Sequence, residues 1–117
     1  MSMEVVVWAA CALSLPADLP SADKWESFGK NEYAYIQKSW KVSVYKEQKL
    51  TPTKEVAAVN PAHNIATTVS VEPIGASNQA YAFWASVAES ISKKCGGATL
   101  ESTVGIVKLD AKGHEIR

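Results

Sequence analysis

One glycine-containing loop in the sequence has the layout of a phosphate-binding site. Residues 71–85 read VEPIGASNQAYAFWA and pass from a β-type stretch through Gly75 into the start of a helix. A P-loop needs further glycines and a lysine followed by Ser or Thr, and a dinucleotide-binding turn needs three spaced glycines. This loop has one glycine, no lysine and a glutamate on its approach. We therefore expect a corner, in which Pro73 ends a strand and Ser77 or Asn78 caps the helix, rather than an anion site.

The histidines and carboxylates give weak support for catalysis. His63 lies in a long loop with no cysteine or acid at metal-ligand spacing, and the other histidine lies in the C-terminal tail. A nucleophilic site needs a base that is held against a Ser or Cys, and no pattern brings Ser70 or Cys95 to His63. Glu72 and Glu101 could be neighbours on adjacent strands, but such acids are most often solvated. We expect no catalytic residue, no metal ion and no cofactor.

The composition favours a folded domain whose partner is neither nucleic acid nor a membrane. A chain of 117 residues is one domain by length, and 47% hydrophobic with 21% charged residues is typical of folded proteins. Twelve basic and twelve acidic residues cancel, so no net charge attracts a polyanion or an anionic membrane. Arg117 is the only arginine, although phosphate and base recognition favour the guanidinium group.

The cysteines and the N-terminal run bear on the compartment. Cys11 and Cys95 could bridge, but the predicted elements place Cys11 in a strand core and Cys95 at a helix end, which favours unpaired, buried thiols in a reducing compartment. The apolar run VVVWAACALSL has the length of a signal peptide. It is preceded by a glutamate instead of a basic residue, and it is too short to cross a bilayer as a helix. We therefore predict that this run is retained as a strand in a cytoplasmic protein.

The hydrophobic pattern predicts six elements in the order β-α-β-β-α-β. Residues 80, 83, 84, 87, 88 and 91 form one apolar stripe, so the best-defined element is a helix over residues 78–95. The other elements are a strand at 5–15, a short helix capped by Ser21, a strand or kinked strand pair at 32–47, a strand at 65–72 and a strand at 99–109, with a long loop at 49–64. This order predicts an α+β, ferredoxin-like split βαβ fold, with two helices on one face of a four-stranded antiparallel sheet. The strands at 5–15 and 65–71 should be central.

Charge is uneven along the chain and suggests two candidate surfaces for a protein partner. The first is acidic and lies on the predicted short helix and its flanks; the second is a lysine-rich strand that carries a tyrosine. The candidate residues are Asp18, Asp23, Glu26 and Glu32 on the first surface and Lys41, Tyr45 and Lys46 on the second.

In its size, its single domain and its lack of catalytic motifs, the chain resembles the bacterial immunity proteins of contact-dependent growth-inhibition and related polymorphic-toxin systems. The resemblance implies a protein that binds and neutralises one cognate toxin domain, often a nuclease, through a protein–protein interface. The near-neutral charge departs from the acidic charge common among immunity proteins against nucleases. The alternative is a small ferredoxin-like ligand-binding domain or cofactor-free enzyme, similar to dimeric α+β-barrel monooxygenases, with a pocket between sheet and helices.

Overall fold

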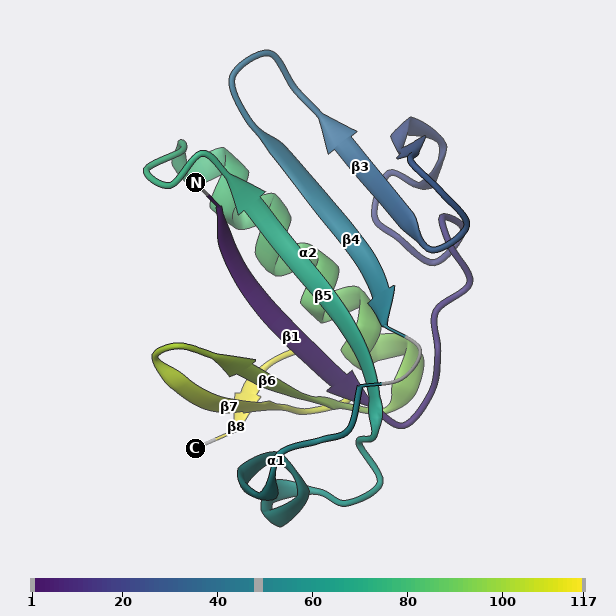
Figure 1. The fold of residues 1–117 in the computed structure, drawn as a ribbon, viewed down its shortest axis with the longest axis vertical. Helices are drawn as coiled ribbons and strands as arrows, with labels where there is room; N and C mark the ends of the chain where they lie inside the picture. Colours follow the sequence, from purple (N-terminus) through teal and green to yellow (C-terminus); the bar gives the residue numbers. More distant parts are fainter. Residues whose placement is uncertain (1, 48–49, 117) are drawn as a thin grey trace.

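Eight antiparallel strands form one twisted sheet in the order β2-β3-β4-β5-β1-β6-β7-β8 (Figure 1). The structure is a computed structural model that describes residues 2–47 and 50–116, so positions 1, 48, 49 and 117 of the predictions above lie outside it. The strands are β1 (Met3–Ala9), β2 (Glu26–Ser27), β3 (Glu32–Ile36), β4 (Lys41–Glu47), β5 (Ile65–Glu72), β6 (Ala98–Ser102), β7 (Gly105–Leu109) and β8 (Glu115–Ile116). The helices are α1 (Lys54–Val59) and α2 (Asn78–Cys95), with a 3-10 turn at Ala22–Lys24.

The predicted four-stranded ferredoxin-like fold is wrong, because the first predicted helix does not form. Residues 22–24 make only a 3-10 turn, and the chain then enters the short strand β2. Trp25 is buried, whereas Phe28 is 54% exposed, so the two side chains do not share the apolar stripe that a helix would need. Without this helix, the predicted β-α-β unit between residues 5 and 47 does not form.

Two of the four predicted strands each fold as a hairpin, which gives six strands, and the short strands β2 and β8 bring the described sheet to eight. Residues 32–47 form β3 and β4, which pair from Glu32 opposite Tyr45 to Ile36 opposite Lys41. Residues 98–109 form β6 and β7, because the chain turns before Gly105, whose φ of 130° suits glycine. The predicted loop at 49–64 contains the helix α1, which Thr53 caps by accepting a hydrogen bond from the amide of Val56.

The predicted central strands and long helix are confirmed. Strands β5 and β1 are neighbours in the middle of the sheet, and α2 covers one of its faces (Figure 1). Val5, Val7 and Val69 alternate with outward-facing residues and are buried against the helix. The hydroxyl of Ser77 caps α2 by accepting from the amide of Ala80, so the loop at residues 73–77 turns a corner as predicted. Among the described residues, no helix is long and apolar enough to span a bilayer.

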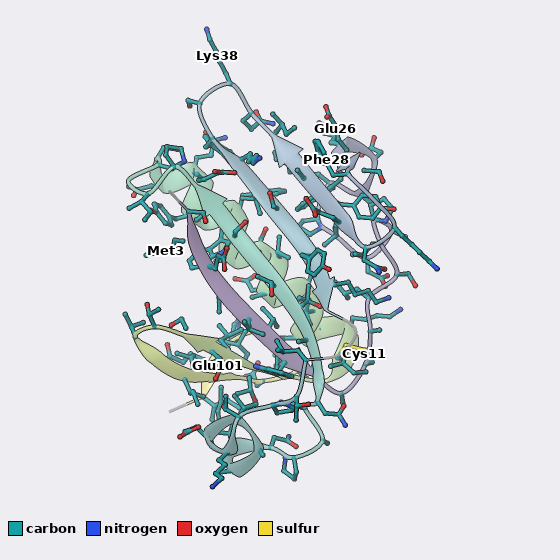
Figure 2. All side chains as sticks on the ribbon, in the orientation of Figure 1. Met3, Cys11, Glu26, Phe28, Lys38 and Glu101 are labelled. Carbon is teal, nitrogen blue, oxygen red and sulfur yellow. A yellow bond between two sulfur atoms is a disulfide. The ribbon has the colours of Figure 1, made fainter. Side chains whose placement is uncertain are left out.

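Cys11 and Cys95 form a disulfide, so the expectation of two unpaired thiols is wrong. The strand β1 ends at Ala9, and Cys11 therefore lies beyond it, next to the C-terminal end of α2 (Figure 2). The two Cα atoms are 5.4 Å apart across 84 residues of sequence. This bond ties the end of the central strand to the end of the helix that covers it.

Candidate protein-binding surface

The sheet has one covered face and one largely open face. The helix α2 packs on the covered face, and Figure 1 views the sheet from the other side with α2 behind it. The short helix α1 covers one end of this second face, where Val56 is buried against Trp8 and Ala66. We call the rest of this face, over β2, β3, β4, β5 and β1, the open face.

The strand register determines which side chains share the open face. Residues directly opposite each other in paired strands project to the same side, so the register gives two rows across the sheet. The first row is Glu26, Ala34, Ser43, Ser70 and Glu4. The second row is Glu32, Tyr45, Thr68 and Val6, and it continues to Glu101 on β6. Ile36, Lys41 and Glu72 extend the face toward the tip of the β3–β4 hairpin.

The open face is acidic. Among the side chains that the structure describes, four glutamates (Glu4, Glu26, Glu32 and Glu72) lie on it with one lysine, Lys41. The Nζ atom of Lys41 lies 3.0 Å from a carboxylate oxygen of Glu72, so this pair largely cancels. Glu4, Glu26 and Glu32 are exposed and make no ion pair among the described residues. The face therefore carries a net negative charge that the whole-chain balance hides.

An aromatic side chain lies between these acids. Tyr45 is 45% exposed and is flanked in its row by Glu32 and Thr68. Ser43, Thr68 and Ser70 beside it are small and polar, so they leave its ring accessible. A partly exposed tyrosine within a ring of polar residues is a typical anchor of a protein interface.

The structure brings together residues from both surfaces that the sequence suggested. Glu26 and Glu32 of the acidic stretch share the open face with Lys41 and Tyr45 of the lysine-rich strand. Asp23 lies exposed in the 3-10 turn that precedes β2.

The remaining two candidates, Asp18 and Lys46, lie off the open face and make contacts that stabilise the fold. Asp18 accepts a hydrogen bond from the amide of Ser14 at 2.8 Å and lies 3.7 Å from Nζ of Lys94 on α2. Lys46 belongs to the face that α2 covers, and its Nζ donates to the carbonyl of Leu13 at 3.1 Å.

Sequence reasoning missed half of the open face. Glu4, Ser43 and Ser70 were not among the candidates, although the alternation in residues 65–72 places Thr68, Ser70 and Glu72 on one side. The sequence did not show which residues of β5 pair with those of β4 and β1, and this register determines which side chains share the face.

The structure also has a cavity between sheet and helix, but it is small. Its volume is about 170 Å³, between α2 and strands β1, β6 and β7. Its lining is mainly apolar, and Glu89 is the charged residue in it. Ligand pockets usually have volumes of about 300–1,000 Å³. This cavity is therefore smaller than a usual ligand pocket, whereas a larger groove of about 330 Å³ lies between the β3–β4 hairpin and α2.

His63 has a structural role. Its Nδ1 atom lies 2.9 Å from the hydroxyl of Thr99, and its Nε2 atom lies 3.2 Å from Nδ2 of Asn60. Because Oδ1 of Asn60 accepts from the amide of Ala62, its Nδ2 faces the ring and donates, so Nε2 accepts and Nδ1 carries the proton. Burial lowers the pKa of His63, which favours this neutral form. Because both ring nitrogens make hydrogen bonds, neither is free to act as a general base.

The acids Glu72 and Glu101 do not form a catalytic pair. Glu72 lies opposite Lys41, whereas Glu101 lies opposite Val6 and accepts hydrogen bonds from the indole of Trp8 and the hydroxyl of Thr53. Among residues 2–47 and 50–116, no three His, Cys, Asp or Glu side chains are grouped closely enough to hold a metal ion.

Comparison with protein-family models, with curated proteins and with solved structures found no match in any of the three.

Proposed function

We propose that this chain is an immunity protein that binds and neutralises a cognate toxin domain, and that the open face is its docking surface. The main observation behind this proposal is that Glu4, Glu26 and Glu32 share a face with the exposed Tyr45. Among the described residues, these three glutamates make no ion pair.

The charge of this face fits a basic partner. A nuclease binds a polyanion, so its active site is lined with cations, and an acidic face that covers it gains in association rate and in selectivity. Several lysines that offset this charge lie off the open face, as with Lys46 on the covered face and Lys93 and Lys94 in the last turn of α2. A net charge of zero is therefore compatible with immunity to a nuclease.

The shape of the open face supports the same function. A sheet face with small side chains in its middle, such as Ser43 and Ser70, presents a broad surface instead of a pocket. Specific protein interfaces bury about 800 Å² on each partner, which requires a broad surface of this kind.

The compartment is part of the proposal. The sequence predicts a cytoplasmic protein, whereas the Cys11–Cys95 bond is typical of proteins that meet an oxidising environment. The disulfide therefore favours an immunity protein that binds its toxin in an oxidising compartment. The cytoplasmic prediction holds if the native protein carries two free thiols.

Titration calorimetry against the toxin domain encoded beside this gene tests the proposal. The double variant Glu26→Lys, Glu32→Lys should weaken binding and reduce its dependence on salt, because it removes two acids from the face. A matched control, Glu89→Lys with Glu115→Lys, makes the same charge change at exposed positions off the open face and should bind like the native protein. Equal losses in both variants, or no loss in the first, would contradict docking through the open face. The absence of any binding would contradict immunity itself.

A further inference from the structure

We propose that a groove on the covered side of the sheet, between the β3–β4 hairpin and α2, binds a proline-rich segment in the polyproline II conformation. This groove lies on the side of the sheet opposite the open face, so the proposal is independent of the proposed toxin interface.

The groove has an aromatic floor. Its volume is about 330 Å³, and it lies between Tyr35, Gln37 and Trp40 of the hairpin and Gln79, Phe83 and Ser86 of α2. The ring centroids of Tyr35 and Phe83 are 4.2 Å apart, and that of Trp40 lies 5.9 Å from Tyr35 and 6.0 Å from Phe83. The floor is therefore continuous across the two elements.

The floor is also held in place from below. The buried ring of Trp25 lies 5.8 Å from both Tyr35 and Phe83, and its indole donates to the carbonyl of Pro20 at 2.7 Å. A ligand would thus meet rings that are already positioned, which lowers the entropic cost of binding.

Trp40 differs from the other three tryptophans in its hydrogen bonding. The indole N–H groups of Trp8, Trp25 and Trp84 donate to Glu101, Pro20 and Val69 respectively. Among the described residues, the N–H of Trp40 has no acceptor, and neither has the hydroxyl of Tyr35 a partner. Within that same part of the chain no fully buried side-chain polar atom lacks a partner. The Trp40 N–H and the Tyr35 hydroxyl are therefore accessible to solvent or to a ligand.

The Trp40 N–H and the Tyr35 hydroxyl, together with the aromatic rings, favour a neutral ligand that is rich in hydrogen-bond acceptors. The indole N–H can only donate, and Gln37 and Gln79 add amide groups at the rim. Of the residues that the structure describes, no charged one lines the groove, and the nearby Lys38 points away from the molecule at the hairpin tip (Figure 2). A charged ligand would find no compensating group here.

A proline-rich segment fits these requirements best. Proline has no N–H, and the carbonyls of a polyproline II helix make no internal hydrogen bonds, so they remain free to accept. Prolyl rings pack on aromatic side chains, and such segments dock in aromatic-lined grooves in other domains. An α-helical ligand is a poorer fit, because its carbonyls are already bonded within the helix.

Nuclear magnetic resonance of the ¹⁵N-labelled full chain with decaproline tests the proposal. The four indole N–H signals are assigned by single Trp→Phe variants. Decaproline should shift the Trp40 indole signal and leave those of Trp8 and Trp84 unchanged. The variant Trp40→Phe, which keeps a ring but loses the N–H, should bind about three- to tenfold more weakly, as expected for one neutral hydrogen bond.

Two controls complete the experiment. Tyr45→Ala removes an exposed aromatic ring from the open face and should bind decaproline like the native protein. A decapeptide of alternating alanine and glutamine, equally neutral but without proline, should not bind. Binding of cello- or chito-oligosaccharides at Trp40 without binding of decaproline would overturn the proposal in favour of a saccharide site. Shifts confined to the open face, or no shift at millimolar decaproline, would also overturn it.

Discussion

Glu32 and Tyr45 lie directly opposite each other on β3 and β4, and their side chains project from the same face of the sheet. In the sequence they belong to two stretches of opposite charge, and only the hairpin register unites them. The pair places an exposed aromatic ring next to an exposed carboxylate that has no ion-pair partner among the described residues. That combination can bind a basic protein surface through both apolar area and charge.

Tyr45→Ala should weaken binding to the toxin domain by about 2 kcal/mol or more, roughly thirtyfold in Kd, if the ring is an interface anchor. The free energy of unfolding should change by no more than about 0.5 kcal/mol, because Tyr45 is an exposed position outside the core. Calorimetry of binding and urea denaturation give the two values. Unchanged affinity would remove Tyr45 from the interface.

The Cys11–Cys95 bond should be present in the purified protein and should stabilise it. Intact mass without reduction should be two hydrogens lower than after reduction, and maleimide should label no thiol before unfolding. The double variant Cys11→Ser, Cys95→Ser should lose about 2–5 kcal/mol of unfolding free energy, because the bond closes a long loop across 84 residues. Two reactive thiols in the native protein would restore the cytoplasmic prediction.

Stability should fall as the pH is lowered from about 7.5 to about 5, because of His63. Burial lowers the pKa of His63 below the 6.5 of an exposed histidine. The unfolded chain therefore takes up a proton at a higher pH than the folded chain does, so the contribution of His63 is complete above about 6.5 and is lost below it. Protonation would also turn Nε2 into a donor facing the donor Nδ2 of Asn60.

The groups around His63 do not supply this pH dependence themselves. Lys108 and Asp110 line the same hollow, and amide hydrogen bonds from His114 and Lys112 hold the pKa of Asp110 below its usual value. Asp110 therefore keeps its charge between pH 5 and 7.5. Urea denaturation at both pH values should show a smaller pH effect in His63→Ala than in the native protein. An undiminished effect in His63→Ala would assign the dependence to other groups.

Local signals in the sequence were sufficient for some elements and insufficient for others. The helix α2 could be predicted because its apolar stripe, its Ser77 cap and the glycine after Cys95 all agree. The central position of β1 and β5 was expected from the split βαβ arrangement, and it is confirmed although that fold is wrong.

The rest of the fold depends on long-range contacts. Residues 32–47 alternate throughout, so the pattern alone did not show that they turn back at 37–40 and pair with each other. The same holds for 98–109, and for Cys11, whose partner lies 84 residues away. The candidate surface was half predicted for this reason: Glu26, Glu32 and Tyr45 were identified, but the neighbours on β5 and β1 required the register.

The segment around α1 should open as a unit that Glu101 holds to the sheet. The sequence predicted this segment to be part of a long loop, yet Val56 is buried against Trp8, and His63 bonds to Thr99. The carboxylate of Glu101 accepts from the Trp8 indole at 3.1 Å and from the Thr53 hydroxyl at 3.0 Å, so it joins β6, β1 and the cap of α1. Glu101→Ala removes both acceptors and leaves the N–H of a buried indole unpaired, at a cost of about 1–3 kcal/mol.

If that cost falls on the α1 segment, amide exchange at Ala57 and Asn60, whose N–H groups bond within α1, should accelerate about tenfold or more. The amides of Val69 and Val71 in β5 should keep their native rates, because their strand pairs with β4 and β1 independently of α1. Hydrogen exchange followed by nuclear magnetic resonance measures all four amides in one experiment. Glu115→Ala, which removes an exposed glutamate from β8, is the control and should leave the four rates unchanged. Equal acceleration at Ala57 and Val69 in Glu101→Ala would show that Glu101 stabilises the whole sheet and that α1 does not open separately.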